Sequence, residues 1–431
     1  MKKKYEKILN EAILKVIPLD ETYEKINEEV KNFISLLKNK IEGENINADV
    51  FIGGSFAKKT LIKKDVYEVD IFVRFFGYKE NEISLILERI VKKTKLPYKK
   101  IKGSRDYFRI EIKKWLFFEV IPVKKISKPE EAENITDLSY FHVNYIKRNL
   151  NEKNLKDVAL AKAFCYSVGC YGAESYIKGF SGYALELLIM HYKGFLNFLR
   201  KISKIDIKNK EIIDIERHYK TKEQILINLN SAKLKSPIIL VDPTYKNRNV
   251  LAALSEETFL RFKKACKEFL KKPSLRFFEK KSLNIEEIRK KAIKTKSELL
   301  LLEIETNKQE GDIAGSKLLK FYNFLRRELS KFFEIKESYF EYLQNKKAFA
   351  IFILKNKKEI LFIGPKENDK RNSEKFKIKH KNFFIKNGRF YSKEKFNEKP
   401  KDFLKNWLNK KNNKKTMKEM SIEKVKIINN F

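Results

Sequence analysis

The chain has 431 residues and carries 95 Lys and Arg side chains against 57 Asp and Glu, which gives a formal net charge of +38. Hydrophobic residues make up 42% of the sequence and aromatic residues 13%, so the composition excludes an intrinsically disordered chain. The length allows roughly two to four domains. The positive charge fits a polyanionic partner such as nucleic acid, but a general bias towards Lys across a proteome would give the same balance. Charge alone leaves both explanations open.

The cysteines and histidines show neither a zinc-ligand spacing nor a disulfide framework. The three cysteines form no C-x-x-C pair, and the four histidines lie far apart in the sequence. We therefore expect a reducing, cytoplasmic location. No apolar run approaches a length of about 20 residues, which a bilayer-spanning helix needs, so we expect no membrane association.

The first ~125 residues alternate between helix and strand patterns, which is typical of an α+β fold. Residues 21–42 place apolar side chains at the i, i+3, i+4 spacing of one buried helical stripe. We predict strands at 48–52 and 66–76, a short basic helix at 55–64, a helix at 84–94 and further strands within 107–123.

The rest of the chain changes character twice. Residues 137–271 are mainly helical in pattern, with one predicted strand at 236–243. A mixture of strand and helix patterns follows, and the Lys- and Asn-rich stretch 409–420 resembles a loose, solvated connection. We therefore predict three parts, with boundaries at 1–136, 137–273 and 274–431.

Two acidic residues stand close together in the predicted strand at 66–76. Because side chains alternate along a strand, Glu68 and Asp70 point to the same face, where their charges repel and call for a cation. Glu119 is a third acid, set in the apolar strand "WLFFEVIPV". It could also be an edge-strand glutamate that faces water, and Glu111 is a competing candidate in a more charged stretch.

The sequence "GGS" at 53–55 is a candidate phosphate site. Glycines let a backbone approach a phosphate closely, a helix N-terminus attracts anions, and Ser55 and Lys58 add a hydroxyl and a positive charge. The same three residues also fit an ordinary turn that caps a helix. A triphosphate held there would carry Mg²⁺, and Mg²⁺ prefers carboxylate oxygens. Three carboxylates could hold two such ions, one for an attacking hydroxyl and one for the leaving pyrophosphate.

This order of motifs resembles the nucleotidyltransferase superfamily of the DNA polymerase β type. Further segments are similar to the archaeal (class I) CCA-adding enzymes, the tRNA nucleotidyltransferases: "YGAESYIKGFSGYALELLI", "VDPTYKNRNVLAALS", and "IGPKENDKRN" with "FFIKNGRFY" downstream. The resemblance runs from about residue 48 through residue 391, nearly the whole chain, with the segments in the family's order.

The resemblance implies a role for each matching residue. It makes the three acids the catalytic, metal-binding carboxylates for two Mg²⁺ ions per site, and it assigns the other matching residues to the nucleotide. The carboxylates are Glu68, Asp70 and Glu119; the triphosphate positions are Gly54, Ser55 and Lys58; the other nucleotide contacts are His142, Lys162 and Tyr171; and Arg248 reads the incoming base.

Two positions depart from the family pattern. The third carboxylate is usually Asp, whereas Glu119 is one methylene longer. The position of Lys58 is usually Arg, so a bidentate fork is replaced by a point charge. Both changes put rate and nucleotide affinity in doubt more than the type of reaction.

The resemblance also implies an architecture and an activity. The architecture is a multi-domain α+β protein with a nucleotidyltransferase palm of mixed sheet and helices, a mainly helical central domain, and C-terminal α/β body and tail domains. The activity is template-independent addition and repair of the 3′-terminal CCA of tRNA from CTP and ATP. The tRNA would bind through its acceptor stem and elbow, and family members are commonly homodimers. Alternatives are a poly(A) polymerase, an oligoadenylate synthetase, or a tRNA-binding protein whose catalytic site has drifted.

Overall fold

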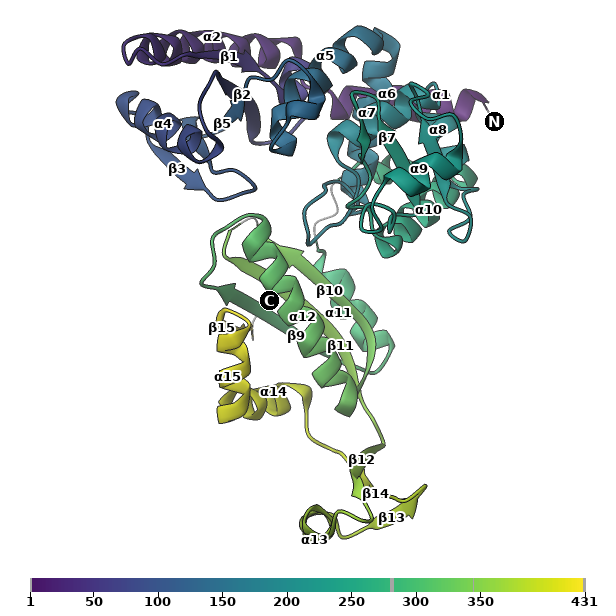
Figure 1. Ribbon diagram of the computed structural model, residues 1–431. Coiled ribbons are helices and arrows are strands. Elements are labelled where there is room, and N and C mark those ends of the chain that lie inside the picture. Colours follow the sequence, from purple (N-terminus) through teal and green to yellow (C-terminus); the bar gives the residue numbers. More distant parts are fainter. Residues whose placement is uncertain (1, 280–282, 344, 429–431) are drawn as a thin grey trace. The chain divides into compact units, whose positions relative to one another are not determined.

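A computed structural model describes residues 2–279, 283–343 and 345–428 of the chain (Figure 1). The chain divides into two compact units, Met1–Lys281 and Ser282–Phe431, each with hydrophobic core clusters of its own. In these described ranges, no helix combines the length and the apolar character that crossing a membrane requires. The prediction of an α+β fold is confirmed, whereas the three-part division stays a prediction.

The first unit opens with a helix and a five-stranded sheet of order β1-β2-β5-β4-β3. Strands β2 and β5 are parallel, and the other neighbouring strands are antiparallel. The elements are α1 (Lys2–Val16), α2 (Asp20–Glu42), β1 (Ala48–Ile52), α3 (Gly54–Ala57), β2 (Tyr67–Phe75), α4 (Glu80–Lys93), β3 (Tyr98–Ile101), β4 (Tyr107–Lys113) and β5 (Leu116–Lys124).

Helices α2 and α4 cover one face of this sheet. Val69, Ile71 and Val73 of β2 are buried in one cluster with the apolar stripes of both helices. Because neighbouring side chains of a strand alternate, Glu68 and Asp70 must point to the other face. The two helices therefore leave the acidic face of the sheet free of their own packing.

Helix α3 is shorter than the predicted helix at 55–64. It ends at Ala57, because Lys59 has a left-handed backbone with φ of 56°. The N–H of Thr60 donates to the carbonyl of Ser55 at 2.9 Å, and that of Lys59 to Phe56 at 3.1 Å, which closes the helix in a Schellman motif. The basic residues that follow are thus outside the helix.

The remainder of the first unit is mainly helical. Its elements are η1 (Pro129–Glu131), η2 (Ile135–Leu138), α5 (Ser139–Asn149), α6 (Glu152–Ser167), α7 (Gly182–His191), α8 (Phe195–Ile202), β6 (Glu211–Asp214), α9 (Lys222–Asn228), β7 (Ile238–Asp242), β8 (Tyr245–Asn249), α10 (Glu256–Lys271) and η3 (Leu275–Phe277). The predicted single strand at 236–243 corresponds to β7. It is flanked by β6 and β8 in a three-stranded sheet, and these neighbours were missed because they are short and, in β8, entirely polar apart from one Tyr.

An aromatic cluster forms much of the core of this helical part. The ring of Phe164 on α6 lies 5.6–6.0 Å from five other phenylalanine rings, measured between centroids. Such pairs contribute about 0.5–1.5 kcal/mol each beyond burial of their area. This packing fixes α6 against α8 and α10, and so holds the polar residues of α6 in place.

The second unit contains two sheets, of order β10-β11-β9-β15 and β12-β14-β13. Helix α12 packs against the first sheet, and α13 against β12 (Figure 1). The elements are α11 (Ile285–Lys294), β9 (Glu298–Thr306), α12 (Asp312–Phe332), β10 (Phe333–Tyr342), β11 (Lys347–Asn356), β12 (Glu359–Lys366), α13 (Lys370–Lys379), β13 (Phe383–Lys386), β14 (Arg389–Lys395), α14 (Pro400–Asn409), α15 (Lys411–Glu419) and β15 (Ile422–Ile427).

The prediction of a loose connection at 409–420 is wrong. This stretch forms helix α15, which packs against α14 and β15. It contains neither Gly nor Pro, and Lys, Met and Glu are good helix formers, so local propensity together with that packing outweighs the polar composition.

Candidate active site

The three candidate carboxylates lie on the open face of the five-stranded sheet. Asp70 on β2 is the register partner of Glu119 on the parallel strand β5, and Glu68 is two residues before Asp70 on the same face. Arg109 on β4 is in turn the register partner of Glu119, and its guanidinium forms an ion pair with Glu68, with 2.8 Å between NH2 and Oε1. Glu111 is exposed. It follows Arg109 by two residues on β4, and its register partner on β5 is Phe117.

The positive charges near the carboxylates do not offset the effects of burial and mutual repulsion. Burial raises the pKa of Asp70 to about 6, and the nearby Glu68 adds to this rise against the opposing effect of Lys58. Burial also raises the pKa of Glu119 to about 8, with further contributions from Asp70 and Glu68. Within the described residues, no three His, Cys, Asp or Glu side chains are grouped so that they could hold a metal ion as they stand. Their mutual repulsion nevertheless fits a cation, provided that Glu68 turns from Arg109.

Gly54 brings the candidate phosphate turn against Asp70. Its φ is +60°, and a Cβ built at this position would lie 1.6 Å from Oδ2 of Asp70. The N–H of Gly53 donates to the backbone carbonyl of Asp70 at 2.8 Å. Only glycine fits at position 54 of this turn. The turn therefore lies directly against Asp70 and restricts the position of its carboxylate.

A buried cluster lies next to this turn and joins it to α6 and α7. Nζ of Lys58 donates to Oε2 of Glu186 at 2.5 Å, and Nζ of Lys162 donates to Oε1 at 2.9 Å. The Lys58 side chain is 8% exposed, that of Lys162 2%, and that of Glu186 0%. Burial alone would raise the pKa of Glu186, but the two lysines lower it to about 2, and burial lowers the pKa of Lys162 to about 8.

Lys162 uses all three of its donors inside the protein. Besides Glu186, its ammonium group donates to the carbonyl of Thr60 at 3.0 Å and to Oγ1 of Thr60 at 2.8 Å. The hydroxyl of Tyr171 is close by: a Cβ built at Gly182 would lie 3.1 Å from that hydroxyl and 3.6 Å from Nζ of Lys162. Direct contact between Lys162 and a phosphate would therefore require the release of one of these bonds.

A second buried carboxylate, Asp242 at the end of β7, gathers the remaining candidate residues. Its Oδ2 accepts hydrogen bonds from Nε2 of His142 at 3.0 Å and from NH1 of Arg248 at 2.8 Å. Its Oδ1 accepts from the hydroxyl of Tyr183 at 3.0 Å. The structure thus brings His142 and Arg248 together, although they lie 106 positions apart in the sequence.

Tyr183 connects this group with the lysine cluster. Its ring packs on that of His142 at 4.3 Å between centroids, and Lys58 and Arg248 each lie 5.8 Å from the centre of the Tyr183 ring. Tyr183 and Glu186 stand three residues apart on α7, so they share one side of this helix.

Sequence analysis missed Glu186, Asp242 and Tyr183. The two acids carried the same signal that singled out Glu119, an acid within an apolar segment: "ALELLIM" for Glu186 and "PIILVD" for Asp242. Both segments entered the predictions as helix or strand patterns and as parts of the family resemblance, and neither acid was singled out. Tyr183 carried no signal of its own in the sequence.

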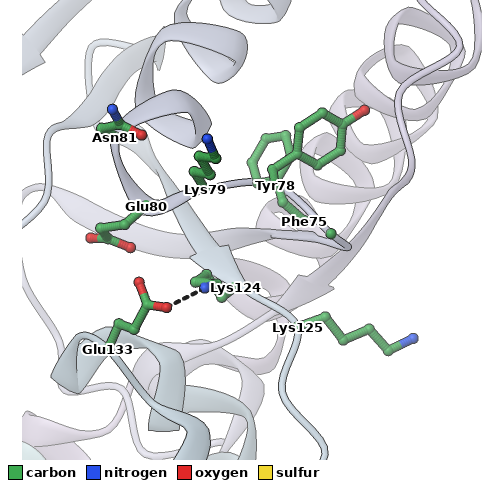
Figure 2. A pocket seen from close by; sticks show the side chains of 9 residues that line it. Phe75, Tyr78, Lys79, Glu80, Asn81, Lys124, Lys125 and Glu133 are labelled. Carbon is green, nitrogen blue, oxygen red and sulfur yellow. Dashed lines mark hydrogen bonds and ion pairs between the residues drawn. The ribbon is translucent and has the colours of Figure 1, made fainter.

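A cavity of about 590 Å³ lies at the other end of the same sheet (Figure 2). It is lined by Phe75 at the end of β2, about 16 Å along the strand from Asp70 at 3.3 Å per residue, and by Lys124 and Lys125. Lys124 pairs with Glu133, and Lys125 with Asp49. Because it is remote from the carboxylates, this cavity is not part of the candidate site.

Comparison with known proteins identifies the family. Residues 156–279 match the family model described as tRNA nucleotidyltransferase, second domain. The CCA-adding enzyme of Saccharolobus islandicus is 30% identical over 329 residues, which cover 75% of this chain and 73% of that protein. The chain belongs to the CCA-adding enzyme family. The family member from Nanoarchaeum equitans is 42% identical over 245 residues, or 56% of this chain and 59% of that protein. The member from Methanocaldococcus jannaschii is 33% identical over 291 residues, or 66% and 63%.

The match spans less than two thirds of the length of the last two family members. Among solved structures, the Cid1 poly(U) polymerase bound to MgATP is similar to this chain with a TM-score of 0.51 at 12% identity, covering 65% of this chain and all of that one. This similarity supports the nucleotidyltransferase type of fold and nothing beyond the fold.

Proposed function

We propose that this protein adds and repairs the 3′-terminal CCA of tRNA without a nucleic-acid template, using CTP and ATP. The observation that carries the proposal is the register pairing of Asp70 with Glu119 on one face of a sheet, next to a turn and to Lys58, which can receive a triphosphate. Membership of the CCA-adding enzyme family supplies the choice of RNA end and nucleotides.

Glu68, Asp70 and Glu119 are the proposed ligands of Mg²⁺, with two ions per site. Their repulsion and burial favour a bound cation, and oxygen ligands suit Mg²⁺. When bound, Mg²⁺ would supply charge neutralisation at the α-phosphate and acidify the attacking 3′-hydroxyl of the RNA. The chain's own contribution is to hold these carboxylates on a rigid sheet and to keep Asp70 in place through Gly54.

The triphosphate would lie over the turn at Gly54 and Ser55. A helix of four residues contributes little dipole, so most of the attraction must come from side chains. Lys58 has donors left after its bond to Glu186, and the lysine cluster is near enough to Asp70 to oppose the rise in the pKa of Asp70. Lys162 and Tyr171 would then act mainly by holding Lys58 and Glu186 in position.

The base of the incoming nucleotide would contact His142 and Arg248. The RNA would bind through the large positive charge of the chain. Backbone-driven RNA binding needs no base sequence, which fits recognition of the tRNA acceptor stem and elbow by shape. A homodimer remains a prediction.

The proposal is tested by single-nucleotide addition to three tRNA transcripts, ending before CCA, after the first two C residues, and at full CCA. Each is given CTP, ATP, GTP or UTP separately with Mg²⁺. We expect C on the first transcript, a single A on the second and nothing on the third. Asp70→Ala should abolish addition while tRNA affinity stays within about a few-fold, because the loss of one carboxylate leaves the Lys and Arg side chains that can bind an RNA backbone unchanged.

Two other outcomes would overturn the proposal. Long A tails on any transcript would indicate a poly(A) polymerase or oligoadenylate synthetase-like activity. Tight tRNA binding with no addition by the unaltered protein would indicate a binding protein whose catalytic site has drifted. Full activity of the Asp70→Ala variant would contradict the assignment of Asp70 as a ligand of Mg²⁺.

A further inference from the structure

Asp242 is a fully buried carboxylate that the proposed chemistry does not use. Its side chain is 0% exposed, and it accepts hydrogen bonds from His142, Arg248, Tyr183 and both the backbone N–H and the hydroxyl of Thr244, at 2.8–3.0 Å. Burial alone would raise its pKa, but these donors hold the pKa well below its usual range. Asp242 is therefore a fixed negative charge.

The groups above Asp242 reach towards solvent. The side chain of Arg248 is 24% exposed and that of His142 is 12% exposed. Among the contacts of the described residues, the guanidinium of Arg248 meets Asp242 only through NH1. Its other N–H groups keep a direction that the buried carboxylate sets, because guanidinium is planar and rigid.

Nε2 of His142 faces both Asp242 and Arg248. Nε2 of His142 is 3.0 Å from Oδ2 of Asp242 and 3.0 Å from NH1 of Arg248. Arg248 cannot accept a hydrogen bond, so a proton on Nε2 can be donated only to Asp242. Burial lowers the pKa of His142, against the opposing effect of its hydrogen bond to Asp242.

Cytosine and adenine share a pattern of hydrogen-bond donors and acceptors, and uracil and guanine have the reverse pattern. On their pairing edges, C and A have an acceptor ring nitrogen beside an amino group, whereas U and G have an N–H donor beside a carbonyl. A guanidinium that can turn freely would donate to the carbonyl of U or G as well. A guanidinium that is fixed can donate to the ring nitrogen of C and A while it opposes the N–H of the wrong bases.

We infer that Asp242 is a positioning residue for nucleotide selection: it anchors Arg248 and His142 in the one arrangement that favours the pairing edges of C and A over those of U and G. This inference rests on the proposed function. Asp242 itself lies beneath these two side chains and does not contact the base.

The test compares Asp242→Asn with the unaltered full-length protein. The measured quantity is kcat/KM for CTP against UTP on a transcript that ends before CCA, and for ATP against GTP on one that ends in CC. Asn keeps the size of the side chain but gives up the negative charge and one acceptor. We expect both ratios to fall by about ten-fold or more, since a well-placed pair of contacts is worth about 1–3 kcal/mol of base discrimination.

Thr244→Val is the matched control. It removes a hydrogen bond to Oδ1 of Asp242 but leaves the charge and both contacts of Oδ2, so the ratios should not change. If Asp242→Asn does not fold, Asp242→Glu keeps the charge and displaces the anchor by one methylene, and the same loss of discrimination is expected. A merely structural role would lower kcat/KM for all four nucleotides by the same factor, and that result, or unchanged ratios, would overturn the inference. If the unaltered protein adds neither C nor A, the proposed function fails instead.

Discussion

Lys58 and Glu186 form an ion pair across 128 positions of the sequence, with 2.5 Å between Nζ and Oε2 and with both side chains almost fully removed from solvent. Lys58 follows the candidate phosphate turn, and Glu186 lies on α7 in the helical part. The pair therefore ties the turn to the helical part. It also gives the charge of Lys58 a fixed direction, set by a buried partner.

Loss of this partner should destabilise the protein strongly. Glu186→Gln leaves Lys58 and Lys162 buried beside a neutral side chain, and breaking a buried pair in this way costs about 3–5 kcal/mol. Urea unfolding of the first-unit transition measures the loss. In a double-mutant cycle with Lys58→Met, the two losses should add to more than the loss in the double variant, because both changes remove one interaction. Strict additivity would mean that the pair does not act as a unit.

The same carboxylate predicts an acid-dependent stability. The pKa of Glu186 is about 2 in the folded protein and near 4.5 in a free side chain, so the folded state binds this proton less readily. Its contribution is fully present above about pH 4.5 and is lost as the pH falls towards about 2. Unfolding free energies measured from pH 5 downward should therefore fall more steeply for the unaltered protein than for Glu186→Gln. Parallel curves would contradict the assignment.

Gly54→Ala should remove activity by displacing Asp70. The new Cβ would stand 1.6 Å from Oδ2 of Asp70, so the carboxylate must move. Gly77→Ala is the matched control, because Gly77 also has a positive φ, +74°, but has no atom within 4 Å of the added Cβ. Both variants should lose about 1–2 kcal/mol of stability from the left-handed backbone. Only Gly54→Ala should lose nucleotide addition, and equal activity of the two variants would refute the role of this contact.

The sequence was informative where the pattern is local. Period-two alternation in β2 is enough to place Glu68 and Asp70 on one face, and an acid in an apolar strand is enough to single out Glu119. The structure adds that Asp70 and Glu119 are direct register partners, which depends on the strand order of the sheet and so on pairing between distant segments.

Long-range partners could not be predicted in this way. Glu186 and Asp242 are buried because Lys58, Lys162, His142 and Arg248 converge on them from other elements, and no local period reports such convergence. Helix α15 was missed for a different reason. Its polar composition suggested a loose connection, although packing and helix propensity stabilise a helix there.

Arg109 should compete with metal ions for the candidate carboxylates. It lies opposite Glu119, forms an ion pair with Glu68 at 2.8 Å, and packs its guanidinium 4.5 Å from the ring centre of Phe117. Arg109→Gln removes this internal cation without emptying the space. The concentration of Mn²⁺ or Mg²⁺ at half-saturation should fall by about two- to five-fold, because a half-exposed ion pair contributes about 0.2–1 kcal/mol. Calorimetric titration with Mn²⁺ measures this without any turnover.

Arg74→Gln separates this effect from a general loss of positive charge. Arg74 lies on β2, four residues from Asp70. It pairs with Asp49 through two contacts, of 2.5 and 2.8 Å. Both variants change the net charge by the same amount, so any long-range attraction of the cation changes equally. Tighter metal binding only in Arg109→Gln would therefore locate the ion beside Glu68 and Glu119. Equal shifts in the two variants would mean that Arg109 does not compete for the carboxylates, and weaker binding in Arg109→Gln would mean that this arginine instead holds Glu68 ready for the metal.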